Sequence, residues 1–135
     1  MDLTKILLLL VMIYLHIVDD YRHQGILAQM KQKSYWEENA PDKMYRYDYM
    51  MALFMHSFSW TFMIMLVPAI YSLYFNDGFG DQNTTVMTLL AFFVLNLFDH
   101  MVVDNAKANL KYINLIMDQS IHLLQIILTW FVFIF

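Results

Sequence analysis

Three pairs of one histidine and one aspartate lie four residues apart in segments that are otherwise largely apolar. The pairs are His16 with Asp20, His100 with Asp104, and Asp118 with His122. Four residues make about one turn of an α-helix, so the two side chains of each pair share one helical face. Neutral imidazoles and carboxylates are ligands that suit zinc, iron and manganese. The spacing therefore predicts three helices that each present a His–Asp pair suited to metal binding.

The segment with the second pair carries the longest polar stripe in the chain. Steps of four and three residues stack its polar side chains along one side of a helix. A further apolar segment contains the lone histidine His56. Because a charged side chain at the bilayer centre costs about 2.5–3.5 kcal/mol on insertion scales, we expect these groups to face inward and to pair with one another or with a cation. The stripe consists of Asn96, His100, Asp104, Lys107 and Lys111.

The composition argues for a membrane protein. Of the 135 residues, 60% are hydrophobic and 15% are charged, and the mean hydropathy is +0.47, which argues against a soluble globule. The length suits one domain. The net charge of −4 gives no basic surface for nucleic acid. The absence of cysteine excludes disulfides, thiolate metal sites and cysteine nucleophiles.

The helices that must position these residues follow from the apolar segments. We expect an all-α integral membrane protein with a single domain, residues 1–135, folded as a four-helix transmembrane bundle. The first and third apolar runs are shorter than the roughly 20 residues that cross a bilayer, so their polar ends must lie in or near the membrane. The approximate spans are 3–24, 49–75, 84–109 and 113–135.

The connections have turn signals of their own. We expect the first helix to continue past the membrane through Met30 and a long connection to follow as far as Asp48, which would cap the second helix. Pro68 should kink the second helix. The glycine-rich stretch 76–81 predicts a turn before the third helix.

The basic residues predict the orientation of the bundle. Seven of the eight Lys and Arg residues lie in or beside the first and third connections, and only Lys5 lies on the other side. The positive-inside rule then places those connections in the cytoplasm and both termini outside it, in an inner or cytoplasmic membrane. His16, His56, His100 and His122 all come to one layer near the cytoplasmic end. The seven are Arg22, Lys31, Lys33, Lys43, Arg46, Lys107 and Lys111.

These motifs together resemble the small bacterial and phage integral-membrane family catalogued as domain of unknown function 3307. The first motif is His16-Ile-Val-Asp19-Asp20-Tyr21-Arg-His-Gln24, with lysines after it, and His56 opens the second span. His100-Met-Val-Val-Asp104-Asn-Ala-Lys107 closes the third span, and Asp118-Gln119-Ser-Ile-His122 opens the last. Where the family pattern has a second histidine after His56, this chain has Trp60. The resemblance implies the helical membrane architecture and this residue set, and it implies no particular reaction.

The function that best suits this set is a membrane-embedded metal site, with hydrolysis at the cytoplasmic leaflet as the expected reaction. A divalent metal is expected, with zinc favoured over iron or manganese. Asp20 or Asp104 would act as a carboxylate ligand or general base, and Lys107 would neutralise developing negative charge. The predicted metal ligands are His16, His56, His100, Asp104, Asp118 and His122.

Two other functions suit the same residues. The cluster would serve a proton or metal-ion carrier or channel as a binding station. Alternatively, it would be a structural network that holds the helices of a non-catalytic membrane subunit together. The expected partners are the lipid bilayer and a second copy or a membrane complex. The neighbouring groups Asp19, His23, Asp99 and Lys107 are more often solvated than functional at helix ends.

Overall fold

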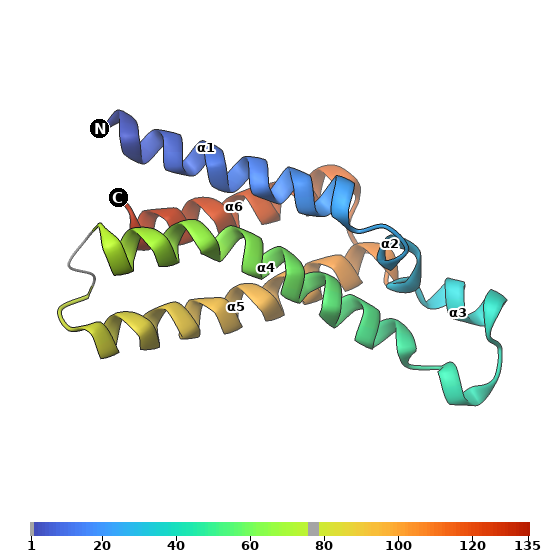
Figure 1. Cartoon of the computed structure of the whole chain (residues 1–135). Helices are drawn as coiled ribbons and strands as arrows, with labels where there is room; N and C mark the ends of the chain where they lie inside the picture. Colours follow the sequence, from blue (N-terminus) through green and yellow to red (C-terminus); the bar gives the residue numbers. More distant parts are fainter. Residues whose placement is uncertain (1, 76–78) are drawn as a thin grey trace.

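The computed structural model describes residues 2–75 and 79–135, which form helices and contain no strand (Figure 1). A π-helical turn, Asp19–His23, follows the first helix directly, and a 3₁₀ turn, Lys43–Tyr45, precedes the fourth. The prediction of an all-helical fold is confirmed. The α-helices are α1 (Leu3–Val18), α2 (Leu27–Met30), α3 (Lys33–Asn39), α4 (Asp48–Tyr74), α5 (Gln82–Ala108) and α6 (Leu115–Phe133).

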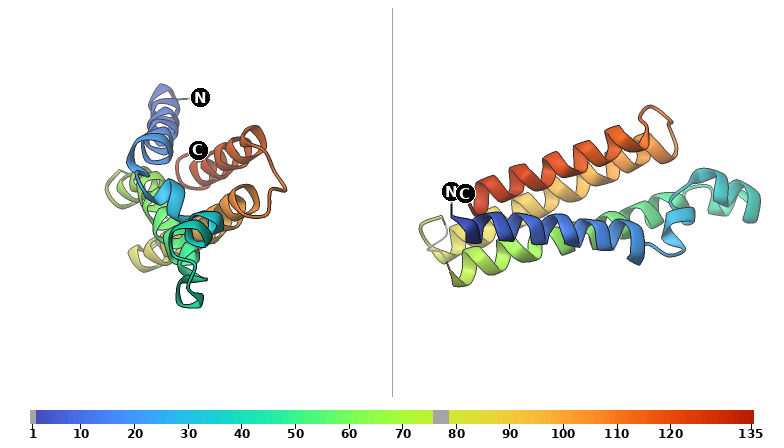
Figure 2. Two further views of the ribbon diagram at one scale, coloured as in Figure 1. Left: turned by 90° about the vertical axis from the view of Figure 1, so that its right-hand side faces the viewer. Right: turned by 90° about the horizontal axis from the view of Figure 1, so that it is seen from above.

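The four long helices α1, α4, α5 and α6 lie side by side around a common axis (Figures 1 and 2). Contacts join α1 to α4, α4 to α5, α5 to α6 and α6 back to α1, which closes the bundle. Both termini lie at one end, where the Lys5 ammonium donates to the Phe135 carbonyl at 2.9 Å and the Trp130 indole N–H donates to the Lys5 carbonyl at 2.8 Å. The short helices α2 and α3 and the α5–α6 connection lie at the opposite end.

Three helical segments in the described part of the chain are long and apolar enough to cross a membrane: Lys43–Tyr74, Gln82–Ala108 and Leu115–Phe133. The first helix is shorter, with 16 residues, and the π-helical turn extends it by five. By length and composition, the chain therefore fits a membrane protein.

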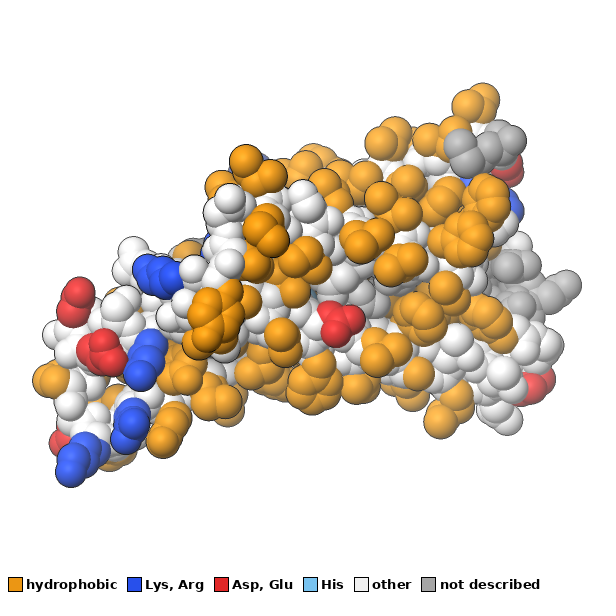
Figure 3. Space-filling view, turned by 180° about the vertical axis from the view of Figure 1, so that it is seen from behind, with side chains coloured by type: hydrophobic (Ala, Val, Ile, Leu, Met, Phe, Trp, Pro, Cys, Tyr) orange, Lys and Arg blue, Asp and Glu red, His pale blue; other side chains and the backbone are white. Residues whose placement is uncertain are grey.

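The usual distribution of side chains between surface and interior is inverted. Apolar side chains cover the outer faces of the helices, for example Leu10, Val94, Leu124 and Phe131, which are all about half exposed or more. In the space-filling view, hydrophobic side chains spread over most of the face, and lysine and arginine gather at the end that α3 forms (Figure 3). Polar and charged side chains are as common in the interior as apolar ones. An apolar exterior of this extent suits a lipid environment.

Local signals explain where the helices begin and break. The Asp81 carboxylate accepts from the N–H groups of Asn83 and Thr84 at 2.8 and 3.0 Å, so it caps α5. The Thr84 hydroxyl also donates to it, and these hydrogen bonds hold the pKa of Asp81 below its usual range. Gly25 has φ +50°, which only glycine adopts freely, and it separates the first helix from α2.

Three sequence predictions need correction or fall outside these ranges. The first helix does not continue to Met30, because Gly25 interrupts it. Asp48 does not cap the second helix; it is the first helical residue, and the preceding Tyr47 makes no side-chain cap. Part of the turn predicted at 76–81, residues 76–78, lies outside the described residues.

Asn114 begins α6 by accepting a hydrogen bond from the Met117 N–H at 2.9 Å. Asn114→Ala is expected to lower the free energy of unfolding by about 1 kcal/mol, because that N–H loses its acceptor. Thermal unfolding in detergent measures the loss. Asn114→Ser keeps an acceptor and should remain close to wild type, so equal losses in both variants would contradict the capping role.

Candidate metal site

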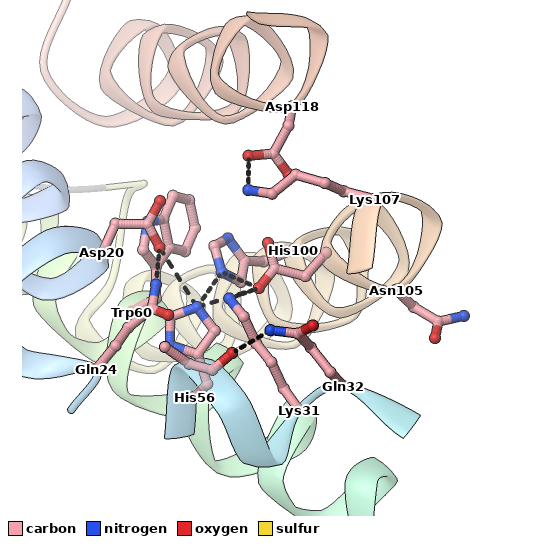
Figure 4. A network of polar contacts seen from close by, with 12 residues as sticks. Asp20, Gln24, Lys31, Gln32, His56, Trp60, His100, Asn105, Lys107 and Asp118 are labelled. Atoms are coloured by element: carbon pink, nitrogen blue, oxygen red, sulfur yellow. Dashed lines mark hydrogen bonds and ion pairs between the residues drawn. The ribbon is translucent and has the colours of Figure 1, made fainter. Parts of the chain in front are cut away.

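Three imidazoles from three helices converge on the carboxylate of Asp104. His56 Nε2 on α4 lies 3.2 Å from Asp104 Oδ2, and His100 Nε2 on α5 lies 3.8 Å from the same oxygen. His122 Nε2 on α6 lies 3.4 Å from Asp104 Oδ1. All four side chains are almost fully buried. The close view shows how His56 and His100 meet at the centre of this network (Figure 4).

Two overlapping groups of side chains are arranged so that they could hold a metal ion: Asp20, His56 and His100, and His100, Asp104 and His122. His56 Nε2 lies 3.1 Å from His100 Nε2 and 3.4 Å from Asp20 Oδ1. Zinc bonds of 2.0–2.1 Å in a tetrahedron place neighbouring ligand atoms about 3.4 Å apart. These two separations are close to the edges of such a tetrahedron, and the 3.8 Å between His100 Nε2 and Asp104 Oδ2 is longer.

The tautomer of His122 favours a cation in this cluster. The Gln125 side-chain oxygen lies 3.0 Å from His122 Nδ1, and because that oxygen can only accept, Nδ1 carries the proton. In the neutral ring, Nε2 then offers a lone pair. It faces carboxylate oxygens of Asp104 at 3.4 Å and Asp118 at 3.5 Å. Acceptors that face one another in a buried site need a proton or a metal ion between them.

Unsatisfied polar atoms concentrate in the same place. Among the described residues, His100 Nδ1, His122 Nε2 and Asp118 Oδ1 are buried without a hydrogen-bond partner. A buried polar atom that lacks a partner costs about 1–3 kcal/mol. Coordination of a cation by His122 and Asp118 would satisfy two of these three atoms.

A directed chain of hydrogen bonds surrounds the cluster and involves His16. The Trp60 indole N–H donates to His16 Nδ1 at 2.6 Å, which leaves the proton of a neutral ring on Nε2. His16 Nε2 lies 3.1 Å from the Gln119 side-chain oxygen and donates to it. The Gln119 amide then donates to Asp20 Oδ2 and Asp118 Oδ2, both at 3.0 Å. His16 thus orients two carboxylates through Gln119, and both of its ring nitrogens are engaged.

Two ammonium groups balance the aspartates. Lys31 Nζ donates to Asp104 Oδ2 at 2.5 Å, and Lys107 Nζ donates to Asp118 Oδ2 at 2.6 Å. Lys31 is 7% exposed although it follows the short helix α2. Asn109 fixes this segment to the end of α5, because its amide donates to the Lys31 carbonyl and its side-chain oxygen accepts from the Lys33 N–H.

Aromatic stacking fixes the ring planes. The Trp60 ring stacks on His100 with centroids 4.1 Å apart, and His100 stacks on His122 at 4.2 Å. Trp60 occupies the position where the resemblance predicts a second histidine. Here its ring stacks on His100, and its N–H sets the tautomer of His16. Helix α4 therefore contributes His56 and a tryptophan that orients other side chains.

The structure brings most of the predicted residues together. His56, His100, Asp104 and His122, with the predicted catalytic residue Asp20, form the two candidate groups. Whether they bind a metal stays a prediction. The other predicted residues line the cluster: His16 beside Trp60 and Gln119, Asp118 beside His122, and Lys107 beside Asp118.

The neighbours expected to be solvated divide into two kinds. His23 and Asp99 are exposed. Asp19 is 2% exposed and accepts from the Ser59 hydroxyl at 2.7 Å. The π-helical turn that begins at Asp19 brings this carboxylate and Asp20 inward in succession, which regular helical spacing does not predict.

Sequence reasoning missed the supporting residues Lys31, Trp60, Gln119 and Gln125. From the sequence, Lys31 was named only as one of the seven basic residues that predict the orientation of the bundle. Its place among the lysines after the first motif was the signal that could have identified it. Gln119 lies within the D-Q-x-x-H motif, so it could have been named. Trp60 was named only as a departure from the resembled pattern, because its partner His16 is 44 residues away in the sequence. Gln125 lies three residues after His122, and that spacing was its available signal.

Comparison with protein families, curated proteins and solved structures finds no match for this chain.

Trp60→Phe tests the directed chain of hydrogen bonds that runs from Trp60 through His16 to Gln119. Loss of the N–H leaves His16 Nδ1 unpaired in a buried site. The free energy of unfolding should therefore fall by about 1–3 kcal/mol. The imidazole ¹⁵N shifts of His16 should also change, because its tautomer is no longer fixed. Trp36→Phe is the matched control: it removes the indole hydrogen bond to the Met30 carbonyl, away from the cluster. If the His16 shifts do not respond to Trp60→Phe, the directed chain is wrong.

Proposed function

We propose that this chain is an integral membrane protein that binds a divalent metal in the polar end of a four-helix transmembrane bundle. The observation that carries the proposal is the convergence of three imidazole Nε2 atoms, from α4, α5 and α6, on the buried carboxylate of Asp104. The motifs that resemble the family catalogued as domain of unknown function 3307 support the same residue set, and we propose membership of that family.

The dimensions of the first helix support a fourth crossing. Sixteen residues of α-helix and the five of the π-helical turn give about 30 Å, the thickness of a bilayer's hydrocarbon core. The lysine-rich end then faces the cytoplasm, and both termini face the other side of an inner or cytoplasmic membrane. In this arrangement the cluster lies at the cytoplasmic leaflet.

His56, His100, His122 and Asp104 are the proposed ligands, and zinc suits three imidazoles and one carboxylate better than iron or manganese does. Asp20 lies 3.4 Å from His56 Nε2 and is the alternative carboxylate. His16, which we predicted as a ligand from the sequence, serves in this proposal to orient Gln119. Through Gln119 it holds Asp20 and Asp118, as groups behind a metal site usually hold its ligands.

Hydrolysis is the proposed reaction. A divalent metal polarises a substrate oxygen or lowers the pKa of water. Asp20 is the proposed general base for water, since it lies beside the cluster and also lines the cavity that opens next to it. Lys107, at 30% side-chain exposure, reaches both Asp118 and the surrounding solvent, so it can neutralise negative charge that develops on a substrate.

A proton or metal-ion carrier is the second candidate, and one observation favours it. Buried polar side chains continue from the cluster toward the opposite end of the bundle, where Asn96 and Thr129 are hydrogen-bonded at 3.0 Å. Fully buried Met12, Ile64 and Ile126 lie in the same interior and oppose a continuous polar path. The hydrolase therefore remains the preferred function over a carrier.

Metal content decides between a metal site and a structural network. Wild-type protein purified in detergent without chelator should contain stoichiometric zinc, which elemental analysis measures. His100→Ala should lose it, because the site loses one of its ligands. His23→Ala should keep it, because His23 is exposed. His16→Ala should weaken zinc binding by about 10–100-fold, as removal of an orienting group does.

A structural network gives a different pattern. Wild type would then hold no stoichiometric metal, and His100→Ala would only lower stability, by about 1–3 kcal/mol, through the buried partners that it leaves unpaired. Melting temperatures of the same preparations separate the two patterns.

Accessibility of single cysteines tests the topology, since the chain contains no native cysteine. Lys43→Cys and Lys111→Cys should react with a membrane-impermeant reagent only from the cytoplasmic side. Asn83→Cys, at the start of α5 and near the termini, should react only from the other side. Labelling of positions 43 and 111 from opposite sides would refute the four-crossing arrangement.

A further inference from the structure

A polar cavity of about 350 Å³ opens beside the candidate metal site, between the π-helical turn, α2 and the α5–α6 connection. Its floor adjoins the metal cluster, because Asp20 and Lys31 belong to both. The volume suits a small ligand. The polar lining consists chiefly of Asp20, Gln24, Lys31, Lys107, Lys111 and Gln119.

Three lysines line this one cavity although the whole chain carries a net charge of −4. Lys31 and Lys107 line the cavity and also form ion pairs with Asp104 and Asp118, respectively. Lys111 makes no ion pair with any described residue. It has φ +60° at the α5–α6 connection. Lysine binds phosphate as a concentrated positive charge, so an anion is the ligand that this lining favours.

The charge balance specifies the anion. The aspartates of the cluster, Asp20, Asp104 and Asp118, carry three negative charges, and the three lysines carry three positive ones. A divalent metal in the cluster adds two positive charges to this balance. The other buried carboxylate nearby, Asp19, lies outside both candidate groups and accepts from the Ser59 hydroxyl. Buried charge without compensation is costly. A dianion in the cavity restores neutrality.

The outer lip of the cavity is apolar. Tyr21 and Leu115 line it and are 62% and 54% exposed, on the face that the proposed membrane would cover. A ligand with a charged head and an apolar tail would place its tail along this lip and its head among the lysines.

We propose that the cavity binds a phosphate monoester, presented by a lipid headgroup or by a soluble ester. This names the substrate class of the proposed hydrolase and rests on the proposed metal site. The phosphate dianion lies among Lys31, Lys107 and Lys111, next to Asp20, and its binding requires the metal charge.

Calorimetric titration of the detergent-solubilised full chain tests the proposal, with zinc content measured on every sample. The probes are short-chain phosphatidic acid and glycerol 3-phosphate, which are monoesters, and short-chain phosphatidylglycerol, which is a diester. At about pH 8 the monoesters are largely dianions. Zinc-loaded protein should bind a monoester more tightly than the diester, and removal of zinc should weaken binding by at least about tenfold.

The lysine variants locate the site. Lys111→Asn should weaken binding of the monoester about 3- to 10-fold, and asparagine tolerates the positive φ of that position. Lys43→Asn removes the same charge on an exposed turn outside the cavity and should leave affinity unchanged. Tighter binding of phosphatidic acid than of glycerol 3-phosphate supports a lipid headgroup as the source, and equal binding supports a soluble ester.

The proposal would be overturned by no binding of either monoester, by diester binding of equal strength, or by equal losses in Lys43→Asn and Lys111→Asn. Stoichiometric zinc without monoester binding would reject the substrate class and leave the metal site standing. Absence of zinc would reject the metal site itself. Monoester binding that does not change when zinc is removed would also overturn the proposal, because the charge balance would be wrong.

Discussion

The buried carboxylate of Asp104 is the constraint on which the polar end of the molecule depends. An ion removed from water costs several kcal/mol unless opposite charges and hydrogen bonds compensate for it. Here the ammonium of Lys31 compensates for it, and His56 Nε2 lies 3.2 Å from the same carboxylate. The lone pair of His122 Nε2, 3.4 Å from the other oxygen, adds a place for a proton or a metal ion. These contacts require the segment after α2, α4 and α6 to meet α5 at one depth. Asn109 strengthens the same junction by holding the backbone around Lys31. One carboxylate therefore accounts for much of the tertiary arrangement at this end.

The opposite half of the bundle is held by apolar packing, which makes the site accessible from one side. Met12, Ile64 and Ile126 are fully buried between the cluster and the termini. The cavity with the lysines opens at the other end. A candidate site that is closed toward one end of the bundle and open toward the other suits an enzyme or a binding protein. A channel requires a path through both halves, and this packing opposes one.

The sequence predicted the helices and the layer of histidines because both follow from local periodicity and from antiparallel packing of short apolar segments. His16, His56, His100 and His122 meet as expected. Which histidines are candidate ligands and which one orients other side chains could not be predicted, because these roles depend on contacts between residues far apart in the sequence. The hydrogen bond from Trp60 that occupies His16 joins positions 44 residues apart, and the Lys31–Asp104 pair joins positions 73 apart. Asp19 and Asp20 both turn inward because the helix widens into a π-helical turn, and hydrophobic periodicity does not anticipate such a turn.

The position of Lys31 connects the proposed metal site with the proposed phosphate site. Its ammonium contacts Asp104 Oδ2, the same oxygen that lies 3.2 Å from His56 Nε2. A metal ion held by Asp104 and His56 would compete with the ammonium for that oxygen, because like charges at such close range repel strongly in a buried site. Lys31 lines the cavity, so the space beside it accommodates the displaced ammonium. In the proposed metal-bound state, Lys31 thus leaves its carboxylate and becomes available to an anion. In this proposal the same side chain would stabilise the cluster without metal and bind the anion once metal is present.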